Sequence, residues 1–147
     1  MKDIPVIGIN IRSIEANREE QLEGNLQVNN SPRIVDVEEK SVGSLGKDAL
    51  SIDFEYTCSY DEEDGDDSVA EIVMGGEVLF MTENPGEVVE NWEEDQQLPN
   101  EVTVPVINSV MRKCLTRSID LSEELQLPPP LRFPRAKEQS DNARYIS

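Results

Sequence analysis

The run "LSIDFEYTCSY", residues 50–60, constrains the fold of this chain more than any other stretch, because apolar side chains occupy every second position. These side chains belong to Leu50, Ile52, Phe54, Tyr56, Cys58 and Tyr60. A period of two places them all on one face of a β-strand, whereas a helix would scatter them around its axis. The run therefore predicts a strand over 49–60 with one face built to be covered and one polar face.

The next segments predict a β-hairpin. After the strand comes "DEEDGDD", residues 61–67, followed by a second strand-like segment over 68–81 that contains Gly75-Gly76. A short polar loop with Asp64-Gly65 between two such segments is typical of an antiparallel hairpin. The glycine pair indicates either a bulge or a place where another backbone comes close.

The acidic loop has a second interpretation, a calcium site. On the calcium-loop pattern Glu62, Asp64 and Gly65 take the third, fifth and sixth positions and Glu71 takes the twelfth, but Tyr60 stands where the first aspartate is needed. The flanking segments are also strands rather than helices. We favour a solvated turn, and we expect no metal site.

Two further extended segments precede this hairpin. Apolar alternation over 4–17 changes parity near Arg12 and Ser13, which predicts a first strand with a bulge there. The segment from Leu26 to Val37 also reads as extended, with a turn predicted at Asn30 to Pro32.

The periodicity becomes helical after the fourth strand. Asn84 as N-cap, Pro85 at the first position and Glu87 three residues from the cap predict a short helix that carries Trp92. Apolar residues at three- and four-residue spacing predict a longer helix over 103–119, with Pro105 in its first turn.

The end of the chain is rich in proline. Pro128 to Pro130 force an extended path that Leu131 and Phe133 could dock on the body, and disorder is expected beyond Pro134. The predicted class is α+β, a four-stranded antiparallel sheet with a short crossover helix and one long helix packed on one face. We assign residues 1–134 to one domain and 135–147 to a disordered tail.

The charge of the chain restricts its partners. The net charge is −18, with 26 acids against 6 bases in residues 1–102 and 5 acids against 7 bases in residues 103–147. Such a body repels phosphate backbones, so we expect no nucleic-acid partner and favour basic or unfolded polypeptides. The three bases Arg112, Lys113 and Arg117 are read as compensation of the helix dipole rather than as a nucleic-acid stripe. Acids at this density also suggest adaptation to high salt.

Catalysis and redox chemistry find little support in the sequence. The chain has no histidine, and its two cysteines, Cys58 and Cys114, are expected to be buried and reduced. We expect no enzyme activity, no catalytic residue and no cofactor. Because no apolar run reaches membrane-spanning length, we expect no membrane insertion and a cytoplasmic location.

The order of these elements resembles the SecB-type export chaperones. The matching features are Gly75-Gly76 in the fourth strand, Pro99-Asn100 opening the long helix, Pro105 and Cys114 within it, and the tail "LQLPPPLRF". The resemblance covers about residues 6–133. It does not extend to the family's zinc-binding tail, because "AKEQSDNARYIS" has neither cysteine nor histidine.

The resemblance implies a cytosolic holdase for unfolded or nascent polypeptides, with a role in protein export, assembled as a homo-oligomer (dimer or tetramer) through strand edges and helices. Client chains would lie in apolar grooves between the sheet and the crossover region. The candidate client-binding residues are Phe54, Tyr56, Phe80 and Trp92. The alternative is a non-catalytic assembly or adaptor subunit with one fixed protein partner.

Overall fold

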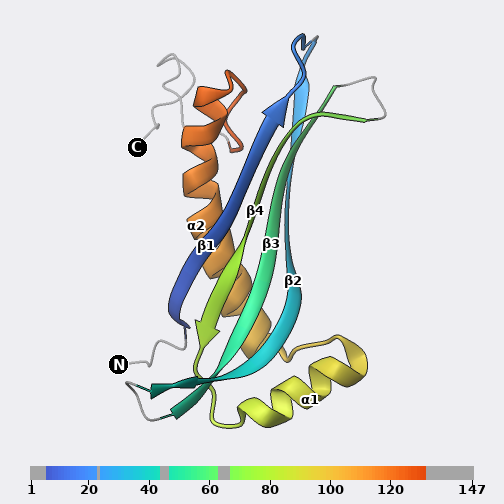
Figure 1. Ribbon diagram of the computed structural model, residues 1–147. Helices are drawn as coiled ribbons and strands as arrows, with labels where there is room; N and C mark the ends of the chain where they lie inside the picture. The colour runs from blue at the N-terminus through green and yellow to red at the C-terminus, as the bar shows by residue number, and fades with distance from the viewer. Residues whose placement is uncertain (1–5, 23, 44–46, 63–66, 132–147) are drawn as a thin grey trace, which may run out of the picture.

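The computed structural model describes residues 6–22, 24–43, 47–62 and 67–131 as a sheet packed against helices (Figure 1). The strands are β1 (Val6–Arg18), β2 (Leu26–Val42), β3 (Lys47–Glu62) and β4 (Ser68–Phe80), and the helices are α1 (Pro85–Asp95) and α2 (Asn100–Glu124). The strand order is β1-β4-β3-β2 and every neighbouring pair is antiparallel, so β1 and β2 form the two edges. The predicted α+β class is confirmed.

The long helix α2 contacts all four strands and runs along one face of the sheet, called here the inner face, while α1 lies across the sheet's end against β2 and β3 (Figure 1). The alternating residues of β3 all point to the inner face and are buried, as their spacing predicts. Their partners on α2 include Val106, Val110 and Cys114, which are also fully buried. The core therefore fills the space between the inner face and the two helices.

The hairpin of β3 and β4 is confirmed, since the two strands pair from Leu50 with Phe80 to Asp61 with Ser68. Of the acidic loop only Asp61, Glu62 and Asp67 are described, and the calcium alternative, which depends on Asp64 and Gly65, falls outside the described residues.

The bulge predicted in the first strand is confirmed, and it explains the glycine pair. The register of β1 against β4 shifts between Ile11 and Ser13, opposite Gly76 and Gly75. A Cβ at Gly76 would lie 2.0 Å from the backbone oxygen of Asn10 and 2.9 Å from Cζ of Phe54. Gly76 thus permits the close backbone approach, while the bulge itself belongs to β1.

The turn predicted at Asn30 to Pro32 is wrong. Strand β2 continues through these residues, and Asn30, Ser31 and Pro32 pair with Cys58, Thr57 and Tyr56. A proline is tolerated because β2 is an edge strand, with no ladder partner on one side among the described residues. The register shift in β2 comes later, between Ile34 and Asp36.

Helix α1 begins where predicted, with Asn84 at the N-cap and Pro85 as its first residue, whereas α2 differs from the prediction at both ends. At α1, Asn84 makes no side-chain cap to the backbone; its amide donates to the carboxylate of Glu87 at 2.9 Å. Helix α2 runs from Asn100 to Glu124, longer than the predicted 103–119, so Pro105 lies inside the helix rather than in its first turn. Proline lacks the N–H that would have bonded the carbonyl of Glu101, which leaves one bond of the helix unmade.

Candidate functional site

The four residues predicted to bind clients lie inside the protomer. Phe54 and Tyr56 are on the inner face of β3, Phe80 is at the end of β4 and Trp92 is on α1, and each is less than one tenth exposed. Phe80 shares a cavity lining with Val88 of α1 and Val102 of α2, whereas Phe54 lies against Gly76 further along the sheet. They belong to one core but form no single open groove, so their role in binding stays a prediction.

A polar layer lies between α2 and the inner face, around Tyr56 and Tyr60. Facing these rings, α2 presents small residues at four-residue spacing, of which Ser118 and Ser122 are buried. Burial raises the pKa of both tyrosines above their ordinary value, although the nearby serines act in the opposite sense. Both hydroxyls therefore remain protonated and able to donate hydrogen bonds.

The two cysteines lie in the same layer. Cys58 and Cys114 are buried and free, as expected. Burial raises the pKa of the Cys58 thiol, and it raises that of Cys114 to about 11. Since the thiolate is the reactive form, neither thiol is activated at neutral pH.

After α2 the chain reverses and forms a strap, defined here as residues 125–131. The reversal uses Gln126 in the left-handed region (φ 58°), with the N–H of Gln126 bonded to the carbonyl of Glu123 and the N–H of Leu127 bonded to that of Ser122. This is the Schellman pattern with glutamine where glycine is usual. Arg18 on β1 also donates to the carbonyl of Leu125 at 2.9 Å.

The strap then crosses the inner face at β3 and β2. The hydroxyl of Tyr60 donates to the carbonyl of Pro128 at 2.7 Å, and the amide of Asn30 donates to the carbonyl of Pro130 at 3.1 Å. Leu127 and Pro130 are buried. The predicted docking by Leu131 is only partial, since this residue is half-buried, and Phe133 lies outside the described residues. The sequence does not predict that Asn30 binds the strap, because the nearby Asn29 and Pro32 are local turn signals that favour a turn at this position.

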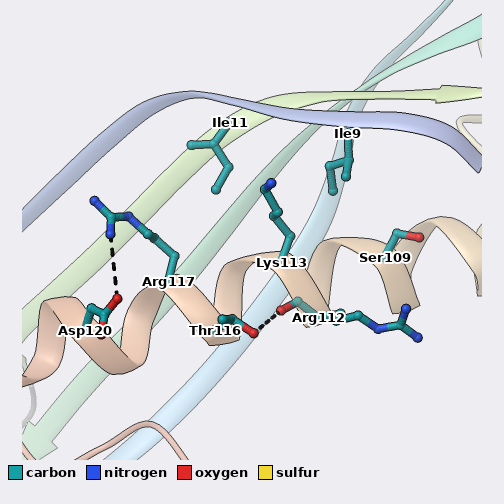
Figure 2. A pocket seen from close by; sticks show the side chains of 8 residues that line it. All are labelled: Ile9, Ile11, Ser109, Arg112, Lys113, Thr116, Arg117 and Asp120. Carbon is teal, nitrogen blue, oxygen red and sulfur yellow. Dashed lines mark hydrogen bonds and ion pairs between the residues drawn. The ribbon is translucent and has the colours of Figure 1, made fainter.

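A groove of about 430 Å³ lies between edge strand β1 and α2 (Figure 2). Ile9 and Ile11 line it from β1, and the side chains of Arg112, Lys113 and Arg117 line it from α2. Arg117 pairs with Asp120 at 3.8 Å. In a strongly acidic chain this is a local basic and apolar surface beside an unpaired strand edge. Ile7 and Ile14 on the same strand are each 40% exposed.

The outer face of the sheet carries an ionic cluster around Glu77. Its carboxylate accepts from Arg12 of β1 at 2.8 Å, from Lys40 of β2 at 3.3 Å and from the hydroxyl of Ser51 on β3. Burial alone would raise the pKa of Glu77, but the Ser51 and Lys40 hydrogen bonds and the Arg12 charge outweigh burial and lower it. The carboxylate thus connects all four strands on this face.

In the part of the chain that the structure describes, no group of three or more His, Cys, Asp or Glu side chains is arranged to hold a metal ion. The same residues include no helix that is long and apolar enough to cross a membrane.

Comparison with known proteins finds similarity in structure rather than in sequence. No family model matches the chain, and no curated protein matches it. Among solved structures, it is similar to the SecB-like chaperone Rv1957 of Mycobacterium tuberculosis, determined in complex with a ChAD peptide from the Rv1956 HigA1 antitoxin. The TM-score is 0.56, and the match covers 91% of each chain at 11% sequence identity.

The fold is SecB-like. The match includes most of the described sheet and helices, so the architecture expected from the resemblance is confirmed. At this identity the likeness concerns the SecB-like fold, and function has to be argued from the surfaces that the fold presents.

Proposed function

We propose that this protein is a molecular chaperone of the holdase type, which binds unfolded or nascent polypeptides in the cytoplasm, with protein export as one use of that binding. The observation that carries the proposal is the SecB-like fold over 91% of the chain, shared with a chaperone whose structure contains a bound peptide.

The surfaces of the protomer are consistent with such a role. A holdase needs apolar area for its clients and surrounding charge that keeps the complex in solution. Here the apolar area that includes Phe54, Tyr56, Phe80 and Trp92 is buried under α1, α2 and the strap, so the proposal requires one of these covering segments to move before a client binds. The net charge of −18 attracts basic segments of unfolded chains. The proposal involves no catalytic step and no cofactor.

Assembly into a homo-oligomer is part of the proposal. Among the described residues, edge strand β1 has no strand partner on its outer side, and its Ile7 and Ile14 are exposed. Ile9 and Ile11 of the same strand line the groove of Figure 2. Pairing of β1 with a second copy would satisfy its free backbone groups and bury these side chains. We assign β1 to the first subunit contact of a dimer or tetramer.

An aggregation assay tests the proposal. A chemically unfolded test enzyme is diluted into buffer at low and at high salt, and its aggregation is followed by light scattering. Equimolar protein should suppress scattering, and equal concentrations of an acidic protein of unrelated fold should not. Unchanged scattering at every salt concentration would count against a holdase.

The adaptor alternative rests on one observation, that the peptide in the Rv1957 complex comes from a single named antitoxin. An adaptor would retain one protein in a pull-down and leave the aggregation of unrelated proteins unchanged. Suppression of several unrelated proteins would exclude it.

A further inference from the structure

The hydrogen bonds that hold the strap are made to its backbone carbonyls and not to its side chains. Tyr60 and Asn30 donate to the carbonyls of Pro128 and Pro130, two residues apart, as an extended segment presents them. The hydroxyl of Tyr56 donates to Oδ1 of Asn30 and so orients the amide toward the strap. Any residue type in an extended segment supplies the same carbonyls, so these donors discriminate by conformation and not by sequence.

Apolar burial supplies the remainder of the contact. Leu127 is buried as part of the hydrophobic core and Pro130 is also buried, while Pro128 and Pro129 are exposed. Of the four side chains from residue 127 to residue 130, the site therefore buries only two, and both are apolar. The chemical class that fits is an extended segment with apolar side chains at spaced positions.

We propose that the inner-face surface around Tyr60 and Asn30 is a binding site for extended apolar segments of client polypeptides, and that the strap is its resting occupant, exchanged for a client segment. The inference rests on the proposed chaperone function and names the part of the client that is recognised. In the absence of client, the strap satisfies the Tyr60 hydroxyl and covers apolar surface that would otherwise promote self-association.

The composition of the strap keeps it displaceable. Pro128, Pro129 and Pro130 have no N–H, so these residues cannot donate to a strand edge and cannot become a fixed fifth strand. Besides the bond from Arg18 to the carbonyl of Leu125, the side-chain hydrogen bonds between the strap's carbonyls and other described residues are those of Tyr60 and Asn30.

A competition experiment on the intact chain tests the exchange without any mutation. The probe is fluorescein-labelled, reduced and carboxymethylated α-lactalbumin, which stays unfolded, and the competitor is a synthetic peptide of residues 125–131. We expect this peptide to displace the probe, and we expect the same peptide with Leu127→Ser to displace it much less. A wild-type peptide that leaves the probe bound at millimolar concentration would overturn the inference.

A strap variant tests the resting occupancy. Leu127→Ser removes the buried apolar anchor of the strap and leaves Tyr60 and Asn30 in place. The fraction of molecules whose site is free of the strap should rise, so the probe should bind about tenfold tighter than to wild type. Val104→Ser, at a residue that is 55% exposed on α2, is the matched control and should bind as wild type does.

The outcomes separate the two proposals. A probe that binds wild type but neither tightens with Leu127→Ser nor yields to the peptide would refute the strap while leaving the chaperone function standing. A probe that binds no variant refutes the chaperone proposal itself. If Leu127→Ser fails to fold by circular dichroism, the peptide competition alone decides.

Discussion

Glu77 faces outward from β4, yet its side chain is only 4% exposed, because Arg12 and Lys40 reach across from the two edge strands. Their own side chains are about half exposed, at 55% and 49%. Solvent therefore screens the two cations while the carboxylate is withdrawn from water. The contribution of the Glu77 carboxylate to folding stability depends on the hydrogen bonds that it accepts, since a buried carboxylate without partners is strongly unfavourable.

Glu77→Gln is expected to lower the free energy of unfolding by about 1.5–3 kcal/mol, the range for hydrogen bonds to a charged group. Because the folded-state pKa of Glu77 is lowered, its contribution is complete above the unfolded-state pKa and is lost as pH falls through the folded-state pKa. Urea denaturation at pH 7 and pH 3 measures this, and the difference between variant and wild type should shrink at the lower pH.

Glu55→Gln is the control for this prediction. Its ion pair with Arg33, at 3.1 Å, has side chains that are 41% and 63% exposed, and such surface pairs contribute less than about 1 kcal/mol. Equal losses for the two variants would show that the Glu77 cluster has no special role.

The neighbouring glycines offer a sharper comparison. Gly76→Ala would place its Cβ 2.0 Å from the backbone oxygen of Asn10, which moves only if β1 moves, and the expected cost is about 3 kcal/mol or more. Gly75→Ala meets the flexible hydroxyl of Ser13 at 3.0 Å and should cost much less. Thermal denaturation of the two variants gives the comparison, and the reverse order would contradict the description of the bulge.

Among the secondary-structure elements, a strand is predicted well from the sequence where its own apolar alternation is sufficient to define it. The alternation in β3 and the parity change in β1 correspond to the observed strand and bulge. In β2 the predicted extended segment is confirmed, but the predicted turn at Asn30 to Pro32 is wrong, because "NNSP" is a local turn signal whereas pairing with β3 holds the segment extended. The strap's contacts join residues 68 and 100 positions apart, and no local pattern encodes such a distance.

Strand β1 also carries the expected subunit contact. Ile14→Lys places a charge on its exposed apolar surface and should shift the protein toward monomers, because like charges would meet across the paired edge. Val35→Lys is the matched control, since Val35 is 45% exposed on the opposite edge strand. Light scattering coupled to size-exclusion chromatography gives the mass. A variant that assembles as wild type does would place the contact elsewhere.

At the scale of the whole molecule, the charge of −18 opposes folding through self-repulsion that salt screens. The few ion pairs between described residues neutralise only a small part of this charge. The melting temperature should therefore rise steeply between 0.1 M and 2 M KCl, a range over which the Debye length falls from about 10 Å to less than 3 Å. A protein that melts at the same temperature throughout would refute adaptation to high salt.

The proposed holdase function requires this SecB-like protein to bind unfolded polypeptide. Sedimentation velocity of fluorescein-labelled, reduced and carboxymethylated α-lactalbumin, with the intact protein at 2 M KCl, tests it most directly. The label should sediment with the protein, and native, disulfide-intact α-lactalbumin should not. A label that sediments as free unfolded chain at micromolar protein would contradict the account.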